Sequence, residues 1–163
     1  MNKFYKVSLE QYVKDNKTRD ISIKEWEDIK IPCPATKNSA GHDFFSPYDF
    51  KLKPNETIKI ATGIKVQLDD DKVLFMVPRS SLGFKYRLQL DNTIGVIDSD
   101  YYNNDGNEGH IFIKLTNDSN SDKTLEVKKG EAIAQGIIVQ FFRADGQNID
   151  TIREGGIGST NGN

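Results

Sequence analysis

An arginine and two hydroxyls follow one short apolar stretch of the chain. Arg79-Ser80-Ser81 comes directly after the run Val73–Val77 and Pro78, so we expect it at the end of a strand. A guanidinium fork beside two hydroxyls and free backbone amides suits a phosphate chain. Taken alone, so short a string is more typical of an ordinary surface turn.

A carboxylate follows a second apolar stretch. Val96-Ile97 predicts a buried strand, and Asp98 stands directly after it, where a side chain can be held rigidly and aimed at a water. Asp100 lies two residues on, and in an extended chain both acids would face the same way. Gly95 permits close approach to the backbone, and Tyr101 offers a flat face to a sugar or base. Taken alone, this string also fits a strand that runs into an acidic loop.

The end of the chain, from Arg153 onward, is rich in glycine and polar residues. It lacks the lysine and the following helix of a phosphate-binding P-loop. An arginine among glycines and hydroxyls could still close over a bound anion. A flexible end is the simpler interpretation of this segment when it is judged alone.

Composition excludes several classes of function. The 163 residues carry 22 Lys and Arg against 24 Asp and Glu, which argues against binding of duplex nucleic acid by a generally basic surface. One cysteine, Cys33, and two histidines, His42 and His110, make a zinc site improbable and an internal disulfide impossible. No apolar run approaches the roughly 18 residues of a membrane helix, and the first residues lack a signal-peptide core. We therefore expect an intracellular protein that uses carboxylates, hydroxyls, amides and arginines.

Alternation of apolar and polar residues runs through most of the chain. This period of two, together with short apolar runs, predicts strands near residues 5–9, 58–68, 73–77, 111–115 and 132–142. Good turn formers separate them at 54–56, 69–71 and 117–122. The pattern predicts an all-β, mainly antiparallel domain over residues 1–152, followed by a Gly-rich arm at 153–163.

One short helix is expected near the beginning of the chain. Ser22 is followed three residues later by Glu25, which is the spacing of a capping box, and then by Trp26 and Ile29. Residues 10–28 look like an insertion between a first strand and the remainder of the domain. We interpret this insertion as a surface elaboration without chemistry.

Five strings stand out along the chain. They are A-G-H-D-F at 40–44, P-R-S-S-L-G at 78–83, N-T-I-G-V-I-D-S-D-Y at 92–101, G-E-A-I-A-Q at 130–135 and R-E-G-G-I-G-S-T at 153–160. In this order they resemble the motifs of the trimeric dUTP pyrophosphatase (dUTPase) family. The resemblance covers about residues 29–162, and the string at 92–101 is the most diagnostic and that at 40–44 the weakest.

The resemblance implies a fold, an assembly and a reaction. Family members are similar to a β-barrel of jelly-roll character and assemble as trimers in which three subunits contribute to each active site. The implied reaction converts dUTP and water to dUMP and pyrophosphate, with Mg2+. Magnesium prefers phosphate oxygens and waters to a dedicated protein cage, so the missing His and Cys cluster agrees with this chemistry.

The resemblance also implies roles around the phosphates. Asp98 would activate the water that attacks the α-phosphorus. Gln135 and Asp43 would steady the phosphates or metal-bound waters. Arg79, Ser80 and Ser81 would hold phosphate oxygens. Arg153 and the Gly-rich arm, with the substrate-binding residues Gly156, Ile157, Gly158, Ser159 and Thr160, would close over the γ-phosphate from a neighbouring subunit.

Further roles follow for the nucleoside. Asn92 and the backbone from Gly95 through Val96 and Ile97 to Asp98 would read the edge of the uracil. The returning strand near Phe112 would complete that pocket. Tyr101 would pack on the deoxyribose and leave no room for a 2′-hydroxyl.

Three features depart from the usual family pattern. Ile157 stands where an aromatic residue commonly covers the uracil, so the closed arm would lack ring stacking. Residues 102–108 lengthen the turn after Tyr101, and we interpret them as a tolerated insertion rather than a partner site. His42 replaces an apolar or aromatic residue, and a packed or surface role is expected for it.

Two other functions remain open from the sequence. The dCTP deaminases resemble this fold and share the R-S-S string, but Lys114 stands near the place of their catalytic glutamate. A nucleotide-sensing module that binds a regulatory protein through 10–28 or 102–108 is the second alternative. Such a sensor would not need Asp98.

Overall fold

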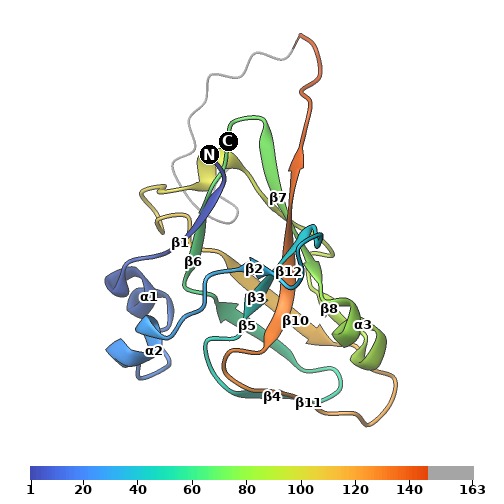
Figure 1. Ribbon diagram of the computed structural model, residues 1–163. Helices are drawn as coiled ribbons and strands as arrows, with labels where there is room; N and C mark the ends of the chain where they lie inside the picture. The colour runs from blue at the N-terminus through green and yellow to red at the C-terminus, as the bar shows by residue number, and fades with distance from the viewer. Residues whose placement is uncertain (147–163) are drawn as a thin grey trace.

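The computed structural model describes residues 1–146, and strands dominate this part of the chain (Figure 1). Every strand pairing among these residues is antiparallel, so the expectation of an all-β, mainly antiparallel domain is confirmed. The strands are β1 (Lys3–Lys6), β2 (Cys33–Pro34), β3 (Gly41–Phe45), β4 (Phe50–Leu52), β5 (Thr57–Ala61), β6 (Ile64–Gln67), β7 (Lys72–Pro78), β8 (Leu88–Leu90), β9 (Gly95–Ile97), β10 (Phe112–Asn117), β11 (Leu125–Val127) and β12 (Ala132–Gln140).

The largest sheet has the order β2-β3-β12-β7-β9, and β12 lies at its centre. A second sheet has the order β5-β10-β8, and the pairs β1-β6 and β11-β4 complete the described strands. The single strand expected over 58–68 is a tight β5–β6 connection instead. Gly63 makes that turn with φ +75°, a backbone conformation that a side chain disfavours.

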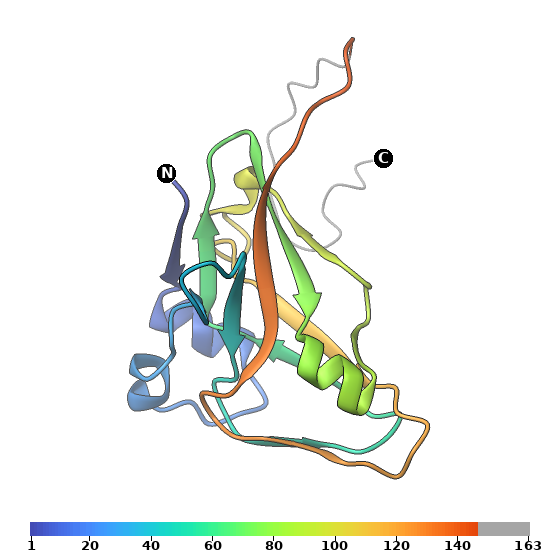
Figure 2. The same ribbon diagram turned by 45° about the vertical axis from the view of Figure 1, so that its right-hand side comes forward.

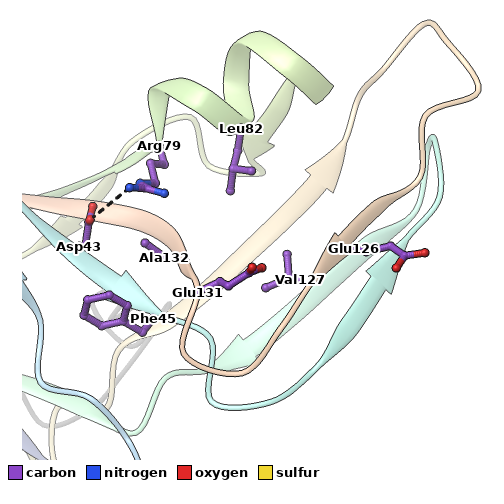
Figure 3. Close-up of a pocket in the computed structure, with 8 residues that line it drawn as sticks. All are labelled: Asp43, Phe45, Arg79, Leu82, Glu126, Val127, Glu131 and Ala132. Atoms are coloured by element: carbon purple, nitrogen blue, oxygen red, sulfur yellow. Dashed lines mark ion pairs between the residues drawn. The ribbon is translucent and has the colours of Figure 1, made fainter. Parts of the chain in front are cut away.

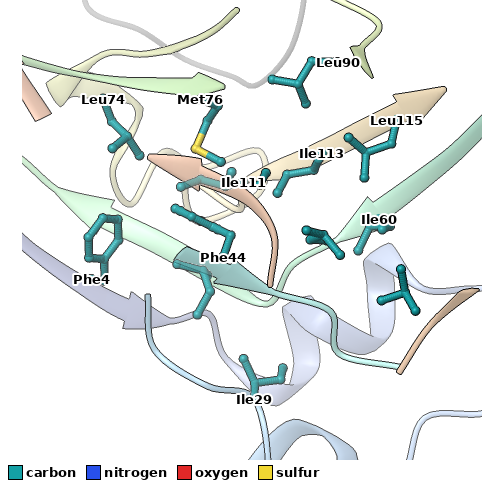
Figure 4. Close-up of a cluster of buried hydrophobic side chains, with 14 of the residues drawn as sticks. Phe4, Ile29, Phe44, Ile60, Leu74, Met76, Leu90, Ile111, Ile113 and Leu115 are labelled. Atoms are coloured by element: carbon teal, nitrogen blue, oxygen red, sulfur yellow. The ribbon is translucent and has the colours of Figure 1, made fainter. Parts of the chain in front are cut away.

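The core lies between these sheets (Figure 4). Phe44, Leu74 and Met76 project from one face of the large sheet, and each is at most 2% exposed. Ile113 and Leu115 of β10 are as deeply buried from the opposite side. Full burial of each such side chain contributes roughly 1.5–3 kcal/mol. The alternation read from the sequence at 111–115 therefore marks Ile113 and Leu115 correctly as the core-facing residues of β10.

Two helices, α1 (Leu9–Asp15) and α2 (Ile23–Glu27), lie beside β1 and β6 (Figure 1). The capping interaction expected for α2 is confirmed, since Ser22 Oγ accepts from the Glu25 amide at 3.1 Å. Helix α1 was not expected, because the alternation through residues 5–9 fits a strand. Ser8 is the N-cap of α1, and its Oγ accepts from the Gln11 amide at 3.0 Å. The helix therefore begins where the alternation predicted that the strand would continue.

The insertion is more than a surface elaboration. Tyr12 of α1 is fully buried, and Ile29 just after α2 is 6% exposed, so both belong to the core. A third helix, α3 (Ser80–Tyr86), follows β7 and was also not expected. None of the helices within residues 1–146 has the length and apolarity needed to cross a membrane.

Candidate active site

Three strands of the large sheet bring together five of the expected site residues, which we term the arginine cluster (Asp43, Arg79, Ser80, Ser81 and Gln135). Gln135 of β12 pairs with Asp43 of β3 on one side and with Val77 of β7 on the other. Partners across antiparallel strands share a face, so these side chains form one row. Arg79 extends from the end of β7 and places its guanidinium 3.5 Å from the Asp43 carboxylate.

The glutamine of this cluster depends on a glycine two residues before the aspartate. A Cβ on Gly41 would collide with Oε1 of Gln135. The Gln135 amide occupies that space and its Nε2 donates to the Pro78 carbonyl at 3.4 Å. The small residue in the string at 40–44 therefore leaves room for the glutamine in the string at 130–135.

The two serines lie on a helix rather than at a simple strand end. Arg79 has extended backbone as the N-cap of α3, and Ser80 and Ser81 form its first turn with both residues exposed. Arg87, in the left-handed region at φ 49°, ends the helix. The sequence did not reveal this helix, because its seven residues include Gly83 and carry no side-chain cap.

A cavity of about 370 Å³ adjoins the arginine cluster (Figure 3). Arg79 and Asp43 line one part of it, with Leu82 of α3 nearby. Glu126 and Glu131 also line it, and neither was expected from the sequence, although Glu131 belongs to the G-E-A-I-A-Q string. Like charges repel, so an anion is favoured only at the Arg79 end of this cavity.

A second group of expected residues is contiguous in the sequence, and we term it the aspartate segment (residues 92–101). It begins at a turn after β8, where Thr93 has φ 64° and the Ile94 amide donates to the Asn92 carbonyl at 2.6 Å. A β-branched residue in the left-handed region is strained. This turn leads into β9, which has β7 as its only strand neighbour among residues 1–146.

The end of the aspartate segment corrects two expectations. Val96 is 56% exposed rather than buried, because it lies on the outer face of an edge strand. Asp98 follows β9 as the N-cap of the 3-10 helix η1 (Ser99–Tyr101) and is half-buried. The chain between Asp98 and Asp100 is therefore not extended, so the two carboxylates do not share a face as a strand would require. Asp98 alone keeps the position expected of it, directly after a short strand.

Tyr101 and Phe112 meet at a residue that sequence reasoning did not assign to the site. The hydroxyl of Tyr101, which is 6% exposed, donates to the His110 carbonyl at 3.0 Å. The rings of His110 and Phe112 lie 4.8 Å apart at 37°. Only the position of His110, two residues before Phe112, could have drawn attention to it. The turn at 92–94 begins nearby, since the Asp91 amide donates to the Lys114 carbonyl at 3.1 Å.

Asp98, near the end of the aspartate segment, and the arginine cluster lie at opposite ends of β7. Ile97 pairs with Leu74 near the beginning of that strand, whereas Arg79 follows its last residue. Figure 2 shows α3 at the lower end of β7 and the yellow turn of η1 near the upper end. A strand rises about 3.3 Å per residue, so Asp98 and Arg79 stand roughly 20 Å apart. One chain therefore keeps Asp98 well apart from Arg79.

Several other expectations concern residues near these groups. His42 is packed, as expected, with its ring 5.3 Å from that of Phe4. Cys33 is exposed and opposes Asp43, while its neighbour Pro34 opposes His42, so the cysteine and that histidine lie on opposite faces of the sheet. Among residues 1–146, no three His, Cys, Asp or Glu side chains gather as metal ligands. The expected arm residues, Arg153, Gly156, Ile157, Gly158, Ser159 and Thr160, lie outside the described residues.

Known proteins match this chain over most of its length. The dUTPase family model matches residues 27–161. The deoxyuridine 5′-triphosphate nucleotidohydrolase of Lactococcus lactis is 41% identical over 134 residues, which cover 81% of this chain and 88% of that protein. The corresponding protein of Dictyoglomus turgidum is 36% identical, with 82% and 92% covered.

Solved structures of dUTPases also superpose on this chain. The dUTPase from Streptococcus mutans superposes with a TM-score of 0.67 at 31% identity and covers 88% of this chain and 98% of its own. A mutant dUTPase from phage phi11 of S. aureus, described with a coordinated structural Mg(II) ion, shares the fold with a TM-score of 0.64 at 19% identity, with 93% and 97% covered. The family match, the relatives and the fold together show that this chain belongs to the dUTPase family.

Proposed function

We propose that this protein hydrolyses dUTP to dUMP and pyrophosphate, with Asp98 as the general base. The observation that carries the proposal is the family match over residues 27–161, which includes Asp98 at the end of an edge strand. Pairing of β9 with β7 fixes the backbone before Asp98, so its carboxylate is held in place. In the proposed step, Asp98 takes a proton from a water that attacks the α-phosphorus, and pyrophosphate leaves.

The uracil is proposed to lie against the edge formed by Asn92 and the backbone of Gly95, Val96 and Ile97. An edge strand carries backbone donors and acceptors on its open side, and these can pair with a base. A narrow pocket there would exclude the methyl group of thymine. Cytosine would leave polar groups unpaired, which gives the stronger discrimination.

The triphosphate is proposed to contact the arginine cluster, where Arg79, Ser80 and Ser81 hold its oxygens and Gln135 steadies them. Phosphoryl transfer asks mainly for positioning and charge neutralisation, which a guanidinium and two exposed hydroxyls supply. Closure of Arg153 and the arm from Gly156 to Thr160 over the γ-phosphate is part of the same proposal.

Magnesium fits this arrangement. The Asp43 carboxylate lines the cavity beside Arg79, and Mg2+ commonly combines phosphate oxygens and waters with one or two carboxylates. We propose that Asp43 holds Mg2+ through a water, as the donor set allows. When bound, the ion would neutralise charge on the phosphate oxygens. Asp43 would also keep Arg79 oriented toward the substrate, since the two side chains form an ion pair.

A homotrimer with shared active sites is proposed because one chain separates the two groups. The face of the large sheet that carries Asp43 and Gln135 also bears apolar side chains, of which Val96 is 56% and Val139 36% exposed. A second copy of the chain seated on this face would cover them and bring its own aspartate segment toward the arginine cluster. Cyclic assembly repeats that contact around the ring.

The deaminase alternative finds no support at β10. Lys114 occupies the place where a deaminase would carry its glutamate, and its ammonium pairs with Asp91 at 2.7 Å. For the sensor alternative, the structure shows that the loop at 102–108 is anchored to the domain, since Lys65 Nζ lies 3.0 Å from the Glu108 carboxylate.

The experiment that tests the proposed function measures pyrophosphate release from dUTP, UTP, dTTP and dCTP side by side, with Mg2+ present. Release from dUTP with little from the other three is the expected result. No release from any of the four would contradict hydrolysis. Ammonia release from dCTP would support a deaminase instead.

A further inference from the structure

His110 is completely buried, yet both of its ring nitrogens have partners. Nε2 accepts from the Gly63 amide at 2.7 Å, so the proton must be carried by Nδ1. Nδ1 then donates to Oδ2 of Asp15 at 2.6 Å. Burial lowers the pKa of His110, although Asp15 opposes this effect, and the imidazole is therefore neutral at pH 7. The histidine thus bridges α1 of the insertion and the β5–β6 turn.

The same residue contacts both side chains assigned to the nucleoside. Its carbonyl accepts from the Tyr101 hydroxyl, and its ring lies against Phe112. Asn107 adds a second restraint, since its Nδ2 donates to the Tyr101 hydroxyl at 2.8 Å. A displacement of His110 would therefore also move the side chains of Tyr101 and Phe112.

Asp15 is in turn held by its own helix. Nε2 of Gln11 donates to Oδ2 of Asp15 at 2.7 Å, and the buried ring of Tyr12 anchors the same helix in the core. At the other end of α1, the amide and hydroxyl of Ser8 donate to the two carboxylate oxygens of Glu108 at 3.0 and 2.5 Å. Helix α1 with its cap Ser8 is therefore joined to the chain after Tyr101 at two points, through Ser8 and Glu108 and through Asp15 and His110.

We propose that Asp15 and His110 are positioning residues for the nucleoside, which fix Tyr101 and Phe112 so that the site rejects a ribose 2′-hydroxyl. The inference rests on the proposed function, in which Tyr101 packs on the deoxyribose. It assigns a role to the insertion 10–28 and the loop 102–108. The insertion supplies Asp15, and His110 follows the loop directly, so the buried pair joins the two segments beneath the sugar pocket.

The test compares Asp15→Ala with the matched control Glu10→Ala. Glu10 is an exposed acid on the same helix, so its loss changes the charge of α1 without changing His110. The readout is the ratio of kcat/KM for dUTP to that for UTP. We expect Asp15→Ala to lower this ratio about tenfold, because small displacements of positioning groups have large kinetic effects, and Glu10→Ala to leave it unchanged.

Conservative variants separate positioning from stability. Asp15→Asn retains an oxygen that accepts from Nδ1–H, so it should restore most of the discrimination. If Asp15→Ala folds poorly, Gln11→Leu removes only the amide that holds Asp15 and should lower the ratio about threefold. A loss that is equal for dUTP and UTP, or an unchanged ratio in both Asp15→Ala and Gln11→Leu, would overturn the inference.

Hydrogen exchange in the absence of nucleotide gives a second readout. Peptides that cover residues 101–112 should exchange faster in Asp15→Ala than in Glu10→Ala, and equal exchange would overturn the inference. A wild-type chain that hydrolyses no dUTP would refute the proposed function and this inference with it. A wild-type chain that is selective for dUTP, together with an Asp15→Ala variant that is equally selective, would refute the inference alone.

Discussion

The arginine cluster and the aspartate segment are constructed differently. The cluster draws residues from three distant parts of the sequence and aligns them by strand pairing, with Gln135 between Asp43 and Val77. The aspartate segment is continuous in sequence and is bounded by a strained turn at Thr93 and a short helix after Asp98. The first depends on the register of a sheet, and the second on local backbone shape.

This difference indicates how each group tolerates change. Side-chain identity should dominate in the arginine cluster, because its backbone is fixed by neighbours on both sides of β12. Within residues 1–146, β9 has a strand neighbour on one side only, so the aspartate segment needs support from elsewhere in the fold. His110 and the helix α1 supply such support for Tyr101.

The largest expected effect concerns Asp98, the proposed catalytic carboxylate. Asp98→Asn and Asp98→Ala should lower kcat by at least about 10²–10⁴, the usual contribution of a general base. The fold should persist, because Asp98 is half-buried outside the main core. Steady-state kinetics and circular dichroism check both points. Near-normal turnover in a folded Asp98→Ala protein would remove Asp98 from its role.

Mixing two inactive variants tests whether the two groups cooperate across subunits. Asp98→Asn and Arg79→Ala should each be inactive alone. If every site takes Arg79 from one subunit and Asp98 from another, unfolding and refolding an equal mixture restores about a quarter of the sites. Pyrophosphate release from dUTP measures the recovery. Absence of recovery, in a mixture shown to form mixed trimers, would place both residues of a site in one chain.

A smaller effect is expected from filling the space beside Gln135. Gly41→Ala should displace the glutamine side chain and lower kcat/KM for dUTP about three- to tenfold, with little change in stability. The control is the same substitution in a Gln135→Ala background. There the added methyl group has no amide to displace, so a further loss would argue against this explanation.

The smallest effect concerns pH. Burial holds the pKa of His110 below its usual value near 6.5, against the opposing influence of Asp15 and Glu108 and with the help of Lys59. The unfolded chain therefore binds a proton first as the pH falls. The free energy of unfolding should be highest above about pH 6.5. Below that pH it should decline until the folded histidine also titrates, by about 1.4 kcal/mol for each pH unit by which folding lowers the pKa of His110.

Urea unfolding at about pH 7.5 and pH 5 measures this decline. His110→Gln lacks the titrating group, so its stability should change less between the two pH values than that of the wild type. An equal change in both proteins would show that His110 does not link stability to pH in this range.

Much of the fold follows from the sequence because strands leave a period of two. The alternation at 111–115 and the apolar run at 73–77 correspond to β10 and β7. Helices α1 and α3 escaped prediction because each has only seven residues, too few to establish a helical period over the preceding alternation. Ser8 caps α1, but Ser8 also fits the alternating pattern of the strand before it.

The site was only partly accessible from the sequence. The motif strings identify Asp43, Arg79 and Gln135, which the sheet does bring together. Motifs carry no information about separation, so the distance between Arg79 and Asp98 required the register of β7. The sequence did not predict the contact between Asp15 and His110, because nothing in the local sequence of either residue indicates contact across so many intervening positions.

The strand β7 acts as a spacer of fixed length. In the proposed assembly it separates Asp98 from the arginine cluster, which serve two different substrate molecules. A backbone in a sheet cannot stretch, so inserting or deleting residues between Val73 and Arg79 would misalign two neighbouring catalytic centres at once. Engineers who vary this enzyme can therefore exchange the side chains of β7 more safely than they can alter its length.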